Sequence, residues 1–221
     1  MRSRIVVPEI LDALPVDDPE AIASRRQLRC LNALMGNFRW IARTLKQALP
    51  DKGPIVEIGA GDGQLACLLA EKVPSLRRRY TALDLAPRPA KWPANLIWLE
   101  ANLWSREGEE AIRSARVVIA NLVLHHFTDA ELLRLGTCFK SAALLIFNET
   151  ARRSLHLWQG RTIAWLLNRV TRHDLPVSVR AGFREHELPA LLGLSAERWR
   201  WQTHATFLGA YRCVGGSPSR S

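Results

Sequence analysis

The sequence predicts an α/β fold in which a mostly parallel sheet carries helices on both faces. Three observations predict it. Short β-rich runs alternate with helical runs over residues 54–148, a helical pattern precedes them, and two closely joined strand-like runs follow near the C-terminus. A length of 221 residues suits one domain. We expect an N-terminal helical cap (1–50), a main domain (51–214) and a disordered tail (215–221).

The first 50 residues predict two amphipathic helices. Asp17 or Asp18 can cap a helix that begins at Pro19, and Gly36 is a plausible end for it. Apolar residues recur in this helix near the helical spacing: Ile22, Leu28, Leu31 and Met35. A second helix is expected over residues 38–49. The pattern leaves open whether these helices close over a site as a lid or pack beside the sheet.

The elements of the main domain follow from the change of period along the chain. Strands are expected at residues 55–58, 80–85, 96–99, 116–121 and 142–147, and helices at residues 64–72 and 129–139. A further helix is expected over residues 155–172. Two closely joined strands, at residues 198–204 and 206–214, then predict an antiparallel hairpin at the edge of the sheet.

The cysteines and the apolar runs indicate the cellular compartment in which the protein is expected. Four cysteines are widely separated and have no histidine at metal-ligand spacing: Cys30, Cys67, Cys138 and Cys213. We therefore expect reduced thiols and no metal site. The apolar runs 117–124 and 142–147 are strand-sized, well short of the ~20 residues of a membrane-spanning helix. Pro8 and Glu9 interrupt what would be the apolar part of a signal peptide, so we expect a cytoplasmic protein.

The most informative stretch is a loop that follows the first β-rich run. Three glycines alternate with other residues after Glu57: Gly59, Gly61 and Gly63. Alternate glycines let the backbone turn sharply and approach a ligand closely. Gln64 stands where a dinucleotide-binding loop would need glycine or alanine, and a Walker loop would need a Gly-Lys-Ser/Thr ending that is absent.

This acidic-x-Gly-x-Gly-x-Gly pattern resembles the class I S-adenosylmethionine-dependent methyltransferases, and the resemblance extends over residues 54–148. It implies S-adenosylmethionine as the cofactor and a Rossmann-like, seven-stranded sheet whose last strand is antiparallel. It also implies a set of cofactor-binding residues: Glu57, Gly59, Ala60, Gly61, Gly63, Asp84, Leu85, Asn102, Leu103, Asn121 and Leu122. A turn without a ligand is the alternative for the glycines.

Two residues of this set have specific implied roles. Asp84 ends the second strand, where a carboxylate can hold the two ribose hydroxyls of the cofactor. Asn102 stands where the family usually has an aspartate that binds the adenine amine, so the sequence departs from the pattern there. An amide carbonyl can still accept that hydrogen bond, which weakens the implied role without removing it.

Two adjacent histidines follow the fourth strand within Leu122-Val-Leu-His-His-Phe127, which is similar to a signature of some small-molecule methyltransferases. His126 and His125 are candidate catalytic bases, because imidazole titrates near neutrality. Alternatively, they satisfy the loop or line the pocket. Methyl transfer from a sulfonium needs mainly alignment, so a base is not obligatory. His173-Asp174 is a second acid–base candidate or simply a turn before Pro176.

Positive charge is concentrated near the C-terminus. The net charge is +10, and residues 151–221 contain eleven arginines against four acidic residues. Residues 151–175 are expected to form an inserted basic amphipathic helix, with apolar residues near one face: Leu155, Trp158, Ile163, Leu166, Leu167 and Val170. This face is either core, or a cover for the acceptor pocket, or a peripheral contact of segment 152–172 with an anionic membrane.

Together these observations predict methyl transfer from S-adenosylmethionine to an oxygen or carbon of a small aromatic or lipid-like acceptor. The resemblance is nearest to small bacterial methyltransferases of quinone, phenolic-lipid or aromatic-polyketide biosynthesis. RNA methylation is the alternative that the basic charge suggests. Asn121 is not followed by the Pro-Pro-aromatic signature of amine-methylating nucleic-acid enzymes, so a nucleic-acid partner is not expected. A non-catalytic accessory protein with this fold is the remaining alternative.

Overall fold

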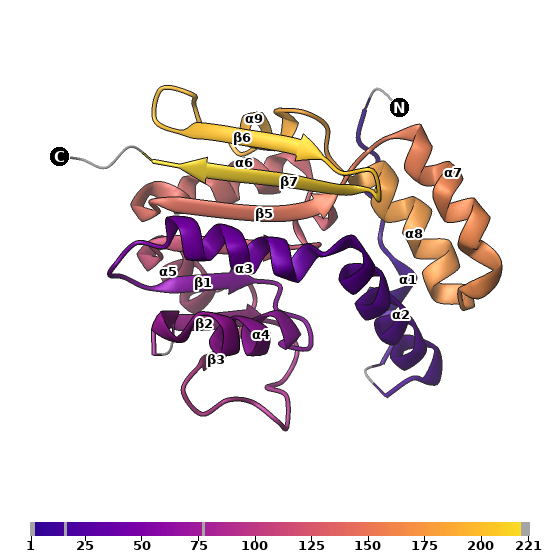
Figure 1. Ribbon diagram of the computed structural model, residues 1–221, viewed down its shortest axis with the longest axis horizontal. Helices are drawn as coiled ribbons and strands as arrows, with labels where there is room; N and C mark the ends of the chain where they lie inside the picture. The colour runs from indigo at the N-terminus through magenta and orange to yellow at the C-terminus, as the bar shows by residue number, and fades with distance from the viewer. Residues whose placement is uncertain (1–2, 16, 77, 218–221) are drawn as a thin grey trace.

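A computed structural model describes residues 3–15, 17–76 and 78–217 of the chain (Figure 1). A seven-stranded sheet with the order β3-β2-β1-β4-β5-β7-β6 forms its centre. The strands are β1 (Ile55–Ile58), β2 (Tyr80–Asp84), β3 (Ile97–Glu100), β4 (Val117–Asn121), β5 (Leu144–Thr150), β6 (Arg200–Ala205) and β7 (Ala210–Gly216). Strands β1 to β5 pair in parallel, whereas β7 is antiparallel to β5 and β6. The predicted α/β fold with a C-terminal antiparallel hairpin is confirmed.

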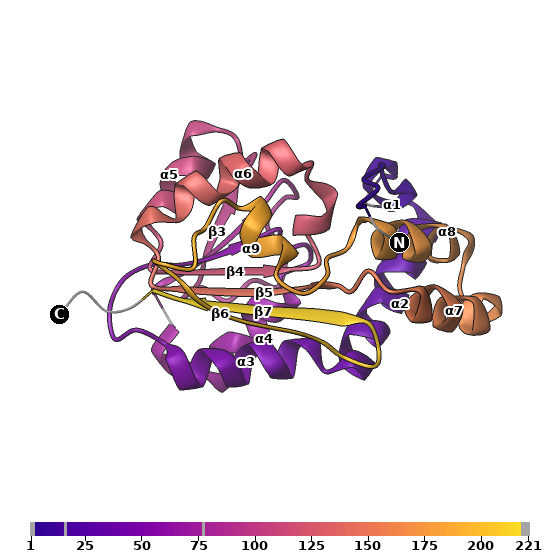
Figure 2. The same ribbon diagram turned by 90° about the horizontal axis from the view of Figure 1, so that it is seen from above.

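Helices cover both faces of the sheet (Figure 2). On one face lie α3 (Asn37–Ala48) and α4 (Gln64–Lys72), which bury Ile41, Leu45 and Leu69 against the sheet. On the other face lie α5 (Arg106–Ser114), α6 (Asp129–Cys138) and α9 (Glu187–Leu191), with Leu132 and Leu135 in their shared core. Each strand supplies both layers because successive side chains point to opposite faces.

Four helices lie together beyond the carboxyl ends of the parallel strands, where Figures 1 and 2 show them apart from the sheet layers. They are α1 (Ile10–Ala13), α2 (Pro19–Met35), α7 (Ser154–Ile163) and α8 (Arg169–Ala181). We call these four helices the cap. Residues 1–50 are thus divided in space, because α3 lies on the sheet. None of the helices in the described residues is long and apolar enough to span a membrane.

Local sequence signals account for the ends of α2. The Asp18 side chain accepts hydrogen bonds from the backbone of Glu20 and Ala21, and Pro19 stands at the first helical position. Gly36, with φ of 66°, ends α2 in the left-handed region and at the same point begins α3. The two helices predicted in the first 50 residues are therefore confirmed, and Asp18 is the N-cap residue of α2.

The prediction of one helix over residues 155–172 is wrong. The chain forms α7, a 3-10 turn (Ala164–Leu166) and then α8, because Leu167 is extended and the Asn168 side chain caps a new helix by accepting from Thr171 N. The turn predicted at His173-Asp174 is also absent, since α8 continues through Pro176 to Ala181.

Two further differences concern elements that the sequence pattern did not reveal. Helices α1, α5 and α9 were not expected, and each of them is short. Gly215 and Gly216 were expected in a disordered tail, but they extend β7 and pair with Leu145 and Leu144 of β5. The antiparallel register places these glycines opposite the first residues of β5, so β7 extends beyond its predicted end at residue 214. The remainder of the expected tail, residues 218–221, lies outside the described residues.

Candidate active site

The glycine-rich loop joins the end of β1 to the start of α4. The backbone N–H groups of Gly59 and Ala60 donate to Leu83 O at 2.9 and 3.2 Å, and Gly63 N donates to Ala60 O at 2.9 Å. The first two bonds fasten the loop to the neighbouring strand β2, and the third closes a turn within the loop. Gly59, Gly61 and Gly63 all have positive φ values, between 59° and 74°, which L side chains rarely adopt. The sequence therefore folds this segment into a fixed, glycine-dependent turn at the carboxyl edge of the sheet.

Two of the glycines differ in what surrounds them, and this gives a matched test. A Cβ at Gly59 would lie 2.5 Å from Val123 Cγ2 and 2.8 Å from Val123 Cβ, whereas a Cβ at Gly61 would meet nothing within 4 Å. Both substitutions share the strain of a positive φ, so only Gly59→Ala adds a clash with a stiff β-branched side chain. We expect Gly59→Ala to lower the free energy of unfolding by about 1–3 kcal/mol more than Gly61→Ala in urea titrations. Equal losses would contradict this contact between the loop and the segment after β4.

Asp84 stands at the end of β2 and faces the loop. Its Oδ2 accepts from Gly61 N at 2.7 Å, and its Oδ1 accepts from Ala86 N at 2.8 Å. Each carboxylate oxygen keeps a further lone pair, so the group can still accept from two hydroxyls. Leu85, directly beyond it, is 71% exposed and offers an apolar surface beside the carboxylate. This combination suits a ribose next to a flat base.

The two asparagines implied by the resemblance lie in different surroundings. Asn102 is exposed, and its Oδ1 accepts from Trp104 N at 2.8 Å in the turn before α5, which also contains Leu103. Asn121 ends β4, and its Oδ1 accepts from Asn148 Nδ2 at 2.9 Å. The amide oxygens of both asparagines thus already hold the local backbone or a neighbouring strand, with one lone pair left on each.

Glu57 lies apart from the opening of the loop. It is buried, and its Oε2 accepts from Tyr80 OH at 2.7 Å within the layer between the sheet and helices α3 and α4. Burial raises the pKa of Glu57 to about 8, and the negative charges of Asp84 and Asp62 act in the same direction. The Glu57 side chain thus joins β1 to β2 within the core and does not face the opening of the loop.

The turn after β4 is strained. Leu122 has φ of 56°, which is uncommon for a residue with a branched side chain, and its N–H donates to Asn148 O at 2.8 Å. The turn continues into the 3-10 helix Leu124–His126, which carries both histidines. Strain of this kind persists where surrounding contacts determine the conformation. Here Val123 packs against Gly59, so the turn and the glycine loop position each other.

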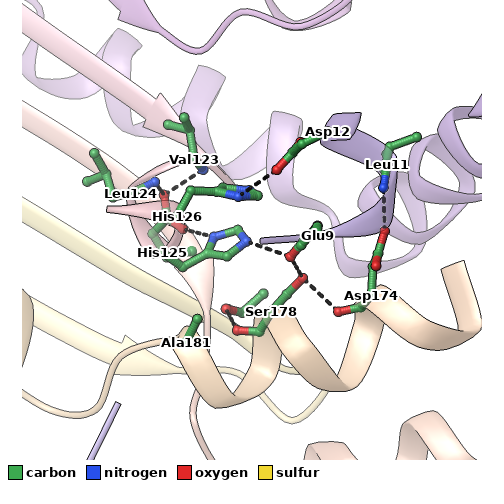
Figure 3. A network of polar contacts seen from close by, with 12 residues as sticks. Glu9, Leu11, Asp12, Val123, Leu124, His125, His126, Asp174, Ser178 and Ala181 are labelled. Carbon is green, nitrogen blue, oxygen red and sulfur yellow. Dashed lines mark hydrogen bonds and ion pairs between the residues drawn. The ribbon is translucent and has the colours of Figure 1, made fainter. Parts of the chain in front are cut away.

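His125 is buried, and Figure 3 shows its ring directed toward Glu9 of the N-terminal segment. Its Nδ1 lies 2.7 Å from Glu149 Oε2, and its Nε2 lies 3.5 Å from Glu9 Oε1. Burial alone lowers the pKa of His125, but the hydrogen bonds and charges of Glu149 and Glu9 outweigh it and raise the pKa to about 9. An imidazolium has no lone pair to accept a proton, so this geometry favours a structural role at neutral pH.

His126 is the more accessible of the pair. Its side chain is 27% exposed, and its Nδ1 lies 3.2 Å from Asp12 Oδ2 on α1. The hydrogen bond to His126 holds the pKa of Asp12 below its usual range. A carboxylate that orients an imidazole through one ring nitrogen leaves the other nitrogen for a reacting group. The geometry thus separates two histidines that the sequence left nearly equivalent.

Residues of the N-terminal segment complete this network, and the sequence reasoning did not identify them. Asp174 accepts from Ile10 N and Leu11 N, each at 2.9 Å, and Ser178 donates to Glu9, so α8 holds the segment in place. Arg4 donates to Asp129 at 2.6 Å and lies over the Phe183 ring. No local pattern marks these residues, because their partners lie more than a hundred positions away.

Glu149 is buried and connects the turn after β4 to the His125 ring. A signal in the sequence could have revealed it. Its Oε1 accepts from Val123 N at 3.0 Å and Leu124 N at 2.9 Å, while its Oε2 holds His125. The polar residues 148–150 directly follow an apolar strand run, at the edge where the functional side chains of parallel sheets gather. The strand was expected to end at residue 147, which left Glu149 unassigned.

Glu9, His125 and His126 each place one possible metal ligand within 4.8 Å of the others. However, both ring nitrogens of His125 face carboxylates, and its raised pKa keeps the ring protonated at neutral pH. An imidazolium has no lone pair to offer to a metal ion. We therefore interpret this group as a network of charges and protons.

No family model matches the chain, and no curated protein does. Solved structures are similar in fold. The plantazolicin methyltransferase BpumL in complex with SAH aligns with a TM-score of 0.65 at 10% identity, over 91% of both chains. The methyltransferase domain of bacterial CtHen1 aligns with a TM-score of 0.61 at 14% identity, over 86% of this chain and all of that one.

Human N-acetylserotonin methyltransferase in complex with SAM aligns with a TM-score of 0.54 at 17% identity, over 94% of this chain and 61% of that chain. At sequence identities this low, the similarity shows the fold alone. The chain therefore has the fold of the S-adenosylmethionine-dependent methyltransferases.

Proposed function

We propose that the protein transfers a methyl group from S-adenosylmethionine to an oxygen or carbon of a small aromatic or lipid-like acceptor. The observation that carries this proposal is the arrangement of the glycine loop and Asp84. The loop is fastened to β2, and the Asp84 carboxylate accepts from Gly61 N at 2.7 Å at the carboxyl edge of the sheet. This is the edge at which open α/β sheets bind their ligands.

The described residues fit the cofactor. Gly61 has open space on the side where a Cβ would stand, so the backbone can approach a ligand closely. Asp84 would accept from the ribose hydroxyls, Leu85 would cover one side of the adenine, and Asn102 would accept from the adenine amine. When bound, S-adenosylmethionine supplies a methyl group on a positively charged sulfur. The surrounding residues contribute alignment with the acceptor and exclusion of water.

We assign His126 as the base that removes a proton from a hydroxyl acceptor, with Asp12 as the residue that orients it. The 3.2 Å contact between His126 Nδ1 and Asp12 Oδ2 fixes the ring, and the side chain remains accessible. His125, held by Glu149 and Glu9, supports the same turn from beneath. The cap contributes Asp12 through α1, so the acceptor site combines the sheet edge with the N-terminal segment.

The assignment of His126 predicts a loss of turnover without a loss of cofactor binding. We expect His126→Gln to lower kcat by about a hundredfold, the usual lower range for a general base, and Asp12→Asn to lower it by about tenfold. The affinity for S-adenosylhomocysteine should stay within about twofold in both variants. His186→Gln, an exposed histidine at the start of α9, is the matched control. Unchanged kcat in His126→Gln would show that alignment alone is sufficient.

The test of the proposed function is calorimetric titration of S-adenosylmethionine and S-adenosylhomocysteine into the full chain. Micromolar binding of both is expected, followed by transfer of labelled methyl to a member of a panel of phenols, quinols and lipids. Failure of both to bind would leave the glycines as a structural turn and end the proposal. Binding without turnover across the panel would instead identify a non-catalytic accessory protein.

A further inference from the structure

Helix α7 and the 3-10 turn after it expose large apolar side chains. Trp158 is 62% exposed and Trp165 is 78% exposed, and Leu155 and Leu166 are also exposed. Leu155 and Trp158 are three positions apart and share a side of α7, and Trp165 and Leu166 follow on the 3-10 turn. The apolar stripe predicted from the sequence is divided. Val170 enters the core, whereas Leu155, Trp158 and Leu166 are exposed to solvent.

The turn between β6 and β7 adds to this surface. Phe207 is 74% exposed and Leu208 is exposed beside it. The turn is held against α7, because Gln159 Nε2 donates to Phe207 O at 3.1 Å and His156 lies against Gly209. We call these six side chains of α7, the 3-10 turn and the β6–β7 turn the apolar surface: Leu155, Trp158, Trp165, Leu166, Phe207 and Leu208. Clustered exposure of this kind marks a binding surface.

Positive charge predominates around the apolar surface. Residues 151–173 contain five arginines and neither aspartate nor glutamate. Arg161, which lies between the two tryptophans in the sequence, and Arg153, at the start of α7, are exposed, as is Arg172 on α8. Arg152 is buried against Glu187, and Arg169 pairs with Glu20, so these two serve the fold. The exposed arginines would meet a negatively charged partner.

A cavity of about 340 Å³ lies at the first residues of α7, next to Leu155. Its lining is Arg152, Arg153, Ser154, Arg184, Glu185 and Ala205. No side chain caps this end of α7. The cavity is large enough for a phosphate group. Arg152 is already paired with Glu187, so the charge left in the lining is that of Arg153 and Arg184 against Glu185, and this net positive charge favours an anion there.

We propose that the apolar surface docks on an anionic lipid bilayer. Tryptophan with adjacent arginine is the combination that suits the boundary between acyl chains and headgroups, because indole is apolar with one polar atom and guanidinium pairs with phosphate. Trp158 and Trp165 insert at this boundary, Arg153 and Arg161 contact headgroups, and the cavity at the start of α7 takes a lipid phosphate. The docking itself needs no cofactor. Its use, access to a lipid-like acceptor, rests on the proposed function.

Sedimentation with vesicles tests the proposal on the full chain. The probes are large unilamellar vesicles of phosphatidylcholine alone, or with about one third phosphatidylglycerol. We expect partition onto the anionic vesicles at least about tenfold above that onto phosphatidylcholine, and its loss as salt shortens the Debye length from ~10 to ~3 Å. The assay uses neither cofactor nor turnover, so its failure is distinct from a failure of the proposed methyl transfer.

Paired variants separate the apolar and the charged contributions. Trp158→Ser with Trp165→Ser should reduce the partition at least tenfold, and each of Arg153→Gln and Arg161→Gln should reduce it about fivefold. Leu133→Ser, an exposed leucine on α6, is the matched control and should bind as the original chain does. The substituted side chains are exposed, and unchanged melting temperatures would confirm that the variants fold.

Four outcomes overturn the proposal. Three concern the vesicles: no partition onto anionic vesicles, equal partition onto both vesicle types, and partition that the paired variants leave unchanged. A fourth is a dimer in sedimentation velocity that the tryptophan variant converts to a monomer, without vesicle binding by either. That result would show that the apolar surface pairs with a second copy of the chain.

Discussion

Asp84→Ala is expected to weaken the binding of both S-adenosylmethionine and S-adenosylhomocysteine by about a hundredfold. Two hydroxyls that donate to a carboxylate form charge-assisted hydrogen bonds, each worth about 1.5–3 kcal/mol. Loss of both oxygens removes these bonds, and about 3 kcal/mol corresponds to a hundredfold in affinity. The same oxygens also accept from Gly61 N and Ala86 N, so the loop loses part of its support. Calorimetric titration measures the affinity directly.

The control for Asp84→Ala is Glu100→Ala. Glu100 is exposed at the end of β3 and pairs in register with Asp84, so its removal changes the local charge by the same amount. We expect its effect to stay below about threefold, since a solvated charge without a hydrogen bond to the ligand contributes little. Equal losses in the two variants would show that the effect is general electrostatics. Unchanged binding in Asp84→Ala would remove the ribose role from this carboxylate.

Glu149→Gln is expected to lower the free energy of unfolding by about 3–5 kcal/mol. The carboxylate is fully buried and accepts from two backbone N–H groups and from the His125 ring. An amide in its place presents N–H groups to at least one of these donors and leaves the imidazolium with Glu9 as its remaining carboxylate. Urea unfolding near pH 7 measures the loss. Glu110→Gln, an exposed carboxylate paired with Arg106, is the control and should cost less than about 0.5 kcal/mol.

The contacts of His125 with Glu149 and Glu9 predict how the free energy of unfolding depends on pH. Glu149 and Glu9 raise the pKa of His125 in the folded chain from 6.5 to about 9. The stabilisation from protonated His125 is therefore complete below pH 6.5 and is lost as the pH rises through about 9. This amounts to about 3 kcal/mol across that window. His125→Gln should flatten that part of the profile, and a flat profile in the original chain would contradict a protonated His125.

The sheet and the glycine loop were predictable because their signals are local. The period of the apolar residues changes along the chain from that of a strand to that of a helix, and this change locates the strands near the loop. Alternating glycines are typical of a tight turn. The same signals place Asp84 and both histidines at one edge, since parallel strands share their carboxyl ends. The environment that distinguishes His125 from His126 was beyond this reasoning. It depends on Glu9 and Asp12, whose contacts arise only when the N-terminal segment packs against the turn after β4.

The 151–175 segment shows a different limit. An apolar stripe flanked by arginines fits both a core-facing and a surface-facing helix, because the period is the same in the two cases. Burial decides between them, and Trp158 and Val170 of the same stripe lie in opposite environments. Asn168 at the break between the two helices did carry a local signal, since asparagine is a favoured cap. The longer apolar pattern obscured it.

The position of the N-terminal segment has a consequence for the order in which the molecule is completed during synthesis. Arg4 bonds to a carbonyl 121 residues away, and Glu9 to a hydroxyl 169 residues away. The segment is synthesised before its partners on α8, which are made only after the strands that carry the glycine loop exist. Closing such long loops is entropically costly, so these contacts form late. A nascent chain can thus assemble the glycine loop before the residues that orient His126 are in place.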